Sequence, residues 1–103
     1  MRLHSPACDR NKRPILDALK PHLASSAGKV HSVLEIAAGS GQHCAYLARN
    51  LEPWVASWYP TDLGMTDEKK ASIASWVEEE GAGDVVRLPA GELDTRSPAW
   101  ELR

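Results

Sequence analysis

The order of apolar and polar positions predicts six elements, with helices and strands alternating along the chain. Apolar residues at helical spacing mark the helices, and runs rich in apolar and β-branched residues mark the strands. Such alternation indicates an α/β fold, with a doubly wound, Rossmann-like parallel sheet and right-handed crossovers. In chain order the predicted elements are helix 13–23, strand 30–37, helix 42–51, strand 54–62, helix 67–80 and strand 84–94.

Single residues mark several of the helix ends. Residues 1–9 are expected to be an irregular lead-in. Pro14 suits the first turn of the helix that follows, where a missing N–H does no harm. Pro21 should end that helix at the preceding residue or kink it. Thr66 suits the N-cap of the third helix, and Gly81 suits its end.

The first predicted strand contains a near-continuous apolar run at residues 33–37. Strands of parallel sheets are usually covered by helices on both sides and therefore lack clear alternation of apolar and polar residues. The run predicts a strand that is buried on both faces.

Composition excludes several classes of protein. The chain has 103 residues, of which 43% are hydrophobic, as expected for one small domain or part of a larger one. Its net charge of −2 gives no general attraction to nucleic acid. It has neither an apolar run of about 18 residues nor a signal-peptide pattern. We therefore expect no membrane span and a cytoplasmic location, the nucleus not being excluded.

The two cysteines, Cys8 and Cys44, are expected to be free thiols. No CxxC or HxxxH pattern accompanies them, so no metal site is predicted.

The stretch LEIAAGSGQH at residues 34–43 places glycines between a strand and a helix, where backbone can approach a ligand closely. The GxxxxGK[ST] pattern of a phosphate-binding P-loop is absent. A dinucleotide-binding turn would need glycine or alanine where Cys44 stands. Glu35 precedes the glycines and would repel a pyrophosphate, whereas the cationic S-adenosylmethionine tolerates an acid there. Alternatively, the glycines form only a structural turn.

Two further acids follow the next strands. Asp62, after the second strand, could accept hydrogen bonds from a ribose diol, and Asp94, after the third, could reach an adenine amino group. With Glu35 they form a row at the carboxyl edge of the predicted sheet. Each acid also has a structural interpretation, as a turn residue or a solvated loop acid. Their order and placement favour a nucleoside site.

Several stretches are similar to the motifs of a known family. The opening SPACDRNKRPIL resembles SPA-x-ERNK-x-PIL, and VLEIAAGSGQH resembles VLE[IV]ASGTGQH, both of the methyltransferase-like 26 family. Shorter similarities lie in WYPTDL, SIASW and LDT. The similar stretches are residues 5–16, 33–43, 58–63, 72–76 and 93–95.

The resemblance implies a class I methyltransferase fold that binds S-adenosylmethionine. It implies that Asp62 holds the ribose hydroxyls, that Asp94 lies near adenine and that His43 lies at the pocket rim. The implied cofactor-binding residues are Glu35, Ala37, Gly39, Ser40, Gly41, His43, Asp62, Leu63 and Asp94.

The resemblance also implies that Arg10, Asn11 and Lys12 fold over the site as a lid. It assigns no catalytic residue and names no methyl acceptor. Alternatively, the chain is a non-catalytic cofactor-binding or interaction module. The third alternative is a nicotinamide-binding oxidoreductase fragment, which Glu35 and Cys44 disfavour.

Family members are longer and continue with further strands, so the resemblance implies a form truncated after about three strands. The expected organisation is an N-terminal lead-in and helix at 1–29 and a partial cofactor domain at 30–103. The first strand would then lack a neighbour along one edge. We expect marginal stability, a homodimer through that edge, or a first strand covered by the N-terminal segment.

Overall fold

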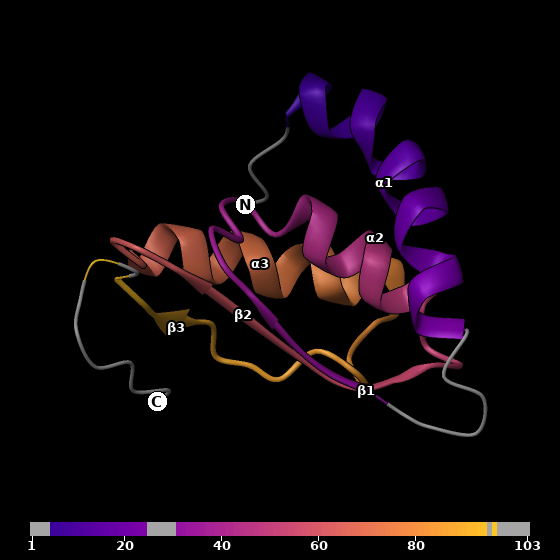
Figure 1. Cartoon of the computed structure of the whole chain (residues 1–103). Helices are drawn as coiled ribbons and strands as arrows, with labels where there is room; N and C mark the ends of the chain where they lie inside the picture. Colours follow the sequence, from indigo (N-terminus) through magenta and orange to yellow (C-terminus); the bar gives the residue numbers. More distant parts are fainter. Residues whose placement is uncertain (1–4, 25–30, 95, 97–103) are drawn as a thin grey trace.

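The computed structural model describes residues 5–24, 31–94 and 96. Helices and strands alternate, as the hydrophobic pattern predicts (Figure 1). The elements are α1 (Pro6–Ala24), β1 (His31–Glu35), α2 (Gln42–Asn50), β2 (Val55–Asp62), α3 (Asp67–Glu80) and β3 (Gly91–Glu92).

The strands form an open parallel sheet in the order β1-β2-β3. In the register of β1 and β2, Val33 lies opposite Trp58 and Leu34 lies opposite Tyr59. Because side chains alternate along a strand, the first pair faces one side of the sheet and the second pair faces the other. The predicted α/β class with a Rossmann-like parallel sheet is confirmed.

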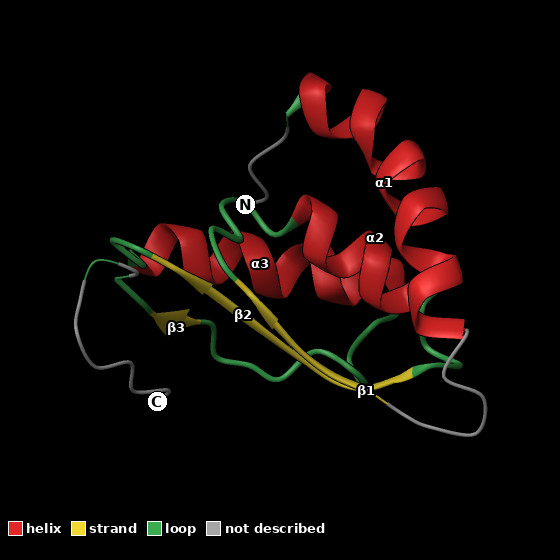
Figure 2. Ribbon diagram, in the orientation of Figure 1, coloured by secondary structure: helices red, strands yellow, loops and turns green. Residues whose placement is uncertain are grey.

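Both α2 and α3 lie on the same face of the sheet, and α1 packs against α2 (Figures 1 and 2). The core therefore lies between β2 and these helices. Its fully buried side chains include Leu51, Val55 and Ile73, and Trp58 is nearly so.

The ends of α3 agree with the sequence analysis. The Thr66 hydroxyl accepts a hydrogen bond from the amide of Lys69, which satisfies one of the free donors of the first turn. Gly81 ends the helix in the left-handed conformation, at a φ of 69°.

The prediction for the N-terminal helix was wrong at its start. The helix begins at Pro6, because the Ser5 hydroxyl accepts from the amide of Cys8 and caps it. Pro6 thus occupies the first-turn position that was assigned to Pro14, and residues 6–9 are helical. Of the two outcomes predicted for Pro21, an end of the helix is wrong, since α1 continues to Ala24 and Leu23 still packs against the core.

The first strand was predicted to be buried on both faces, and this was wrong. Leu34 is 38% exposed and its cross-strand neighbour Tyr59 is 39% exposed, while Ile36 follows on the same side at 47%. Within the described residues no helix covers this face, which we call the bare face. The apolar run at residues 33–37 therefore belongs to a strand, β1, of which the described helices cover only one face.

The third strand is shorter than the predicted 84–94. Only Gly91–Glu92 pairs regularly with β2, and Val86 makes one isolated bridge to Trp58. Pro89 lies between the two contacts and has no N–H to offer a ladder, which interrupts the strand.

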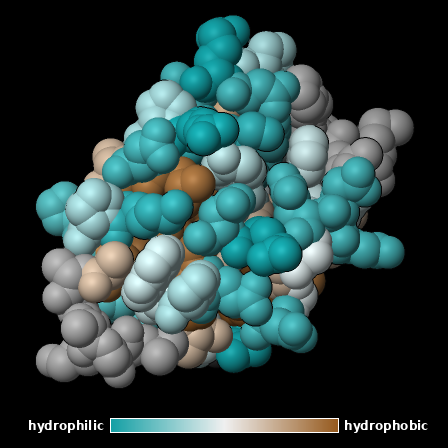
Figure 3. All heavy atoms as spheres, turned by 90° about the vertical axis from the view of Figure 1, so that its right-hand side faces the viewer, coloured by the Kyte–Doolittle hydropathy of each residue, from teal (hydrophilic) through white to brown (hydrophobic). Residues whose placement is uncertain are grey.

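No helix in the described parts of the chain is long and apolar enough to cross a membrane. Seen from the side on which α1 lies, the surface is mainly hydrophilic, and hydrophobic atoms show only in small areas between the hydrophilic ones (Figure 3).

The free edge of β1 leads to the first prediction. Among the described residues β1 pairs only with β2, and α1 packs against α2. Such an edge, beside the bare face, favours pairing with a second chain. We expect concentration-dependent dimerisation in sedimentation velocity experiments. Leu34→Lys should weaken it, whereas Ala71→Lys, on the exposed side of α3, should not. A monomer at all concentrations would contradict the prediction.

Candidate functional site

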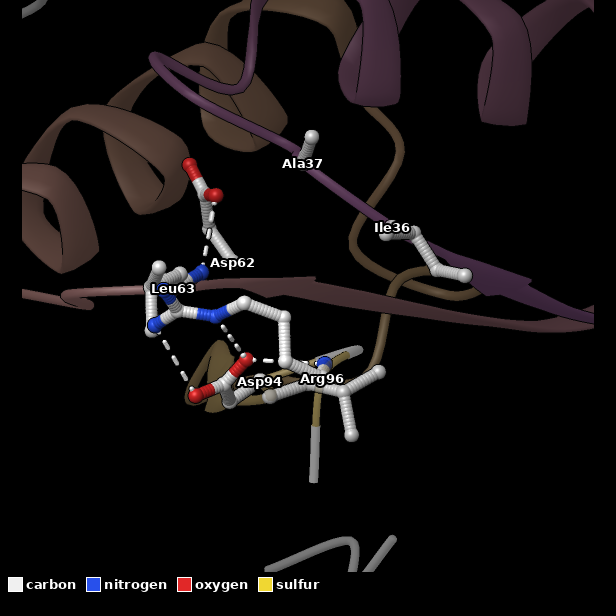
Figure 4. Close-up of a pocket in the computed structure, with 7 residues that line it drawn as sticks. Ile36, Ala37, Asp62, Leu63, Asp94 and Arg96 are labelled. Atoms are coloured by element: carbon white, nitrogen blue, oxygen red, sulfur yellow. Dashed lines mark hydrogen bonds and ion pairs between the residues drawn. The ribbon is translucent and has the colours of Figure 1, made fainter. Parts of the chain in front are cut away.

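A cavity of about 270 Å³ lies where the three strands end. Each strand contributes residues that follow its carboxyl end, and open α/β sheets bind their ligands at this edge (Figure 4). The lining residues are Ile36, Ala37, Asp62, Leu63, Leu93, Asp94 and Arg96. Four of the residues proposed from the sequence, Ala37, Asp62, Leu63 and Asp94, thus come together here.

The glycine turn between β1 and α2 coils through left-handed conformations at alternate residues. The φ angles are 63° at Ala37, 57° at Gly39 and 90° at Gly41. Alanine in this region costs about 1–2 kcal/mol. Strain of this kind is often kept at functional sites. Ala37 lines the cavity, so the strained residue lies where a ligand would approach.

Most amides of the turn donate to acceptors within the protein. The amide of Ala38 donates to the Thr61 carbonyl over 2.8 Å, and that of Gly41 donates to the Ala38 carbonyl over 3.1 Å. The amide of Gln42 donates more weakly to the Ser40 hydroxyl over 3.3 Å. A P-loop, in contrast, points its amides at phosphate.

Asp62 connects the turn to β2. Its Oδ2 accepts from the amide of Gly39 at 3.0 Å and lies 3.4 Å from Lys69 Nζ, and its Oδ1 accepts from the amide of Leu63 at 2.8 Å. The carboxylate therefore fixes the turn relative to the end of β2. A carboxylate has about four acceptor positions, so Oδ1 keeps one for a ligand hydroxyl.

Asp94 and Arg96 lie next to each other in the segment that follows β3 (Figure 4). The guanidinium of Arg96 forms a two-pronged pair, with Nε at 2.9 Å from Oδ1 and Nη2 at 3.1 Å from Oδ2. These hydrogen bonds hold the pKa of Asp94 below its ordinary value and that of Arg96 above it. The Arg96 side chain is largely in solvent and the Asp94 side chain is partly exposed, so the pair is easily rearranged.

Glu35 lies on the helix side of the sheet, apart from the cavity-lining residues. Alternation along β1 places its side chain on the same face as Val33, where Trp58 Nε1 donates to its carboxylate at 3.0 Å. Burial raises the pKa of Glu35, against the lowering effect of hydrogen bonds from Trp58 and Cys44. Burial beside the Glu35 carboxylate also raises the pKa of the Cys44 thiol, which therefore remains protonated.

The remaining predicted residues lie around the turn and on α1. The carbonyl of Ser40 accepts from the buried hydroxyl of Ser72 in α3 at 2.7 Å, and His43 Nε2 is buried without a hydrogen-bond partner among the described residues. Arg10 and Asn11 are exposed on α1, outside the cavity lining. Lys12 pairs with Asp9 and lies 4.8 Å from the Tyr46 ring centre.

Sequence reasoning missed Lys69, Arg96 and Gln42. No spacing signal connects Lys69 or Arg96 with the acids that they meet. Gln42 is 2% exposed and bonds to residues 33 and 37 positions away, so only the fold reveals its contacts. The described residues hold no cluster of three or more His, Cys, Asp or Glu side chains fit for a metal ion.

The raised pKa of Glu35 gives a prediction for stability against pH. The folded state binds this proton more tightly than the unfolded state does, so the resulting stabilisation is complete below the ordinary pKa of 4.5 and is lost as pH rises through the folded-state value. Glu35→Gln keeps an oxygen for Trp58 Nε1 without the charge. We expect the free energy of unfolding of Glu35→Gln, measured in urea, to exceed that of the wild type by an amount that grows above pH 4.5. The exposed Glu52→Gln should show no such trend, and parallel profiles for the Glu35 variant would contradict the prediction.

The two glycines of the turn should respond differently to a methyl group. A Cβ on Gly41 would lie 2.6 Å from the Ile73 backbone, whereas one on Gly39 would meet nothing within 4 Å. Both positions carry left-handed strain. We expect Gly41→Ala to lower the free energy of unfolding by about 2–4 kcal/mol, and Gly39→Ala by about 1–2 kcal/mol. Equal losses in denaturant titrations would show that close packing at Gly41 contributes nothing.

The fold resembles that of a solved enzyme structure, a SAM-dependent methyltransferase from Geobacter sulfurreducens in complex with S-adenosyl-L-homocysteine. The TM-score is 0.57 at 23% sequence identity, over 88% of this chain. The chain spans 32% of the length of that structure. At this identity the similarity establishes the methyltransferase-like fold.

Comparison with protein-family models shows the family to which the chain belongs. Residues 2–103 match the model of DUF938, described as a protein of unknown function. The match covers nearly the whole chain, which therefore belongs to the DUF938 family.

Proposed function

We propose that the chain binds S-adenosylmethionine through the cavity at the carboxyl edge and is a methyltransferase-like protein whose acceptor is not assigned. The supporting observation is the cavity itself, where Asp62 at the end of β2 and Asp94 just after β3 lie beside the strained turn. The resemblance to the methyltransferase-like 26 family and the fold of the Geobacter enzyme both support this proposal.

The contacts of the turn favour this cofactor over a dinucleotide. The amides of Ala38, Gly39 and Gly41 already have acceptors inside the protein, so few are left to bind a pyrophosphate. The cavity also carries two carboxylates, whose counter-cations Lys69 and Arg96 pair with them. These four charges balance, so the cavity has no surplus positive charge to attract a pyrophosphate.

The lining suits the nucleoside part of the cofactor. Ile36, Leu63 and Leu93 give apolar walls for a base, and Asp62 keeps an acceptor position for a ribose hydroxyl. Among the described residues Asp94 Oδ2 accepts from Arg96 Nη2 alone, which leaves room for an exocyclic amine. The volume is near the lower end for small-molecule sites. When bound, the cofactor supplies an electrophilic methyl group, while these residues hold and orient it.

The second candidate is a non-catalytic cofactor-binding or interaction module. It is favoured by the bare face, where Leu34, Ile36 and Tyr59 are exposed. A nicotinamide-binding fragment is the third candidate. We also retain, as part of the proposal, a division of the chain between residues 29 and 30. A cytoplasmic location likewise remains part of it, in keeping with the free thiols of Cys8 and Cys44.

Calorimetric titration with S-adenosylmethionine, S-adenosylhomocysteine and NAD tests the proposal. We expect only the first two to bind, and we expect Asp62→Asn to weaken them at least about tenfold through the lost ribose bond. Glu92→Gln is the matched control, because Glu92 accepts from the amides of Gly64 and Met65 in the same loop but does not line the cavity. Its affinity should equal that of the wild type.

Other outcomes separate the alternatives. Binding of NAD alone would favour the oxidoreductase fragment, and binding of none would favour an interaction module. Transfer of a labelled methyl group to components of a lysate would separate an active methyltransferase from a cofactor-binding module.

A further inference from the structure

The carboxamide of Gln42 joins the beginnings of two helices that are far apart in the sequence. Its Oε1 accepts from the amide of Ser5 at 2.9 Å, and its Nε2 donates to Asp9 Oδ1 at 2.7 Å. We call these three residues the latch. Gln42 is 2% exposed, so both ends of its amide are satisfied away from water.

The latch is built into the capping of α1. Ser5 precedes the helix, and its hydroxyl and carbonyl accept from the amides of Cys8 and Asp9. Asp9 lies in the first turn, where a carboxylate is favoured by the helix dipole, and it also pairs with Lys12 at 3.7 Å. The bond from Gln42 to this carboxylate is charge-assisted and therefore stronger than one between neutral groups.

Gln42 is also the residue that directly follows the glycine turn. The turn is held from three sides: by Asp62 of β2 at the Gly39 amide, by Ser72 of α3 at the Ser40 carbonyl, and by α1 through Gln42. Ser72 is fully buried, and α3 and β2 both contribute to the core. The third attachment differs, because its helix is held more weakly.

In the described part of α1 only Leu16 is buried, while Ile15, Leu19 and Leu23 are partly buried against the core. The helix packs mainly against α2. An element with few buried contacts opens at a lower free energy than the core does. The helix can therefore leave the turn while β2 and α3 remain folded.

We propose that Gln42 is a positioning residue that couples the docking of α1 to ligand binding at the glycine turn. The inference rests on the proposed function, because it takes the nucleoside cavity as the ligand site. A docked α1 fixes the start of α2 and with it the turn, so that a ligand bound against the turn stabilises the docked helix. Such coupling is reciprocal, and the same free energy appears in both equilibria.

A reversal of the hydrogen bond tests the latch. Gln42→Glu places a second carboxylate against Asp9, so α1 should undock. Asp9→Asn alone keeps an oxygen for Gln42 Nε2, so it should weaken the docking of α1 much less than Gln42→Glu does, through loss of the charge only. In the double variant the side-chain amide introduced at position 9 donates to the carboxylate introduced at position 42, which restores the bond in the opposite direction.

The readouts are calorimetric affinity for S-adenosylhomocysteine and hydrogen exchange of the α1 amides with and without it. In the wild type we expect the ligand to slow this exchange. Gln42→Glu should weaken binding about tenfold, the size expected when a buried amide loses one partner, and should remove the effect of the ligand on α1. The double variant should recover both properties. Asp17→Asn, an exposed change elsewhere on α1, should alter neither.

The outcomes distinguish the two proposals. Wild-type affinity in Gln42→Glu with α1 undocked would overturn the coupling alone and leave the latch a purely structural contact. Absence of binding by the wild type would overturn the proposed function and the coupling with it. If Gln42→Glu does not fold, Asp9→Ala breaks the same bond from the more exposed side and is judged by the same two readouts.

Discussion

The close approach of α3 to the glycine turn is the constraint on which the site depends. Ile73 is fully buried and packs so near Gly41 that no side chain fits there. This contact sets the distance between α3 and the start of α2, and the Ser72–Ser40 bond beside it fixes the turn. Because the glycine turn is held in this position, Asp62 can accept a hydrogen bond from the Gly39 amide. The cavity is therefore a consequence of helix packing on one face of the sheet.

The hydrophobic pattern was sufficient for the element order, because each element carries its own period. It was sufficient for the carboxyl-edge cavity as well, since parallel strands bring the residues after their ends together, as with Asp62 and Asp94. The alternation of side chains along β1 also indicates on which face of the sheet Glu35 lies. Residues two apart in a strand share a face, so an inward Val33 implies an inward Glu35.

Other features depend on partners that no local pattern records. The apolar run of β1 is the same whether one face or both are covered, so the bare face could not be read from it. Both Pro14 and Pro6 satisfy the rule for a first turn, and only the Ser5 cap decides between them. Arg96 and Lys69 meet their acids through loop conformation, and Gln42 meets α1 through tertiary packing.

The bare face also bears on how such a chain is handled in a cell. Leu34, Ile36 and Tyr59 are exposed, whereas Val55 and Trp58 of β2 are buried beneath the helices. Exposed apolar surface is what marks an incompletely folded protein for chaperones and aggregation. A folded molecule of this kind offers the same surface as a folding intermediate. While that face is uncovered, chaperones would therefore recognise this molecule as incompletely folded, although its core is already packed.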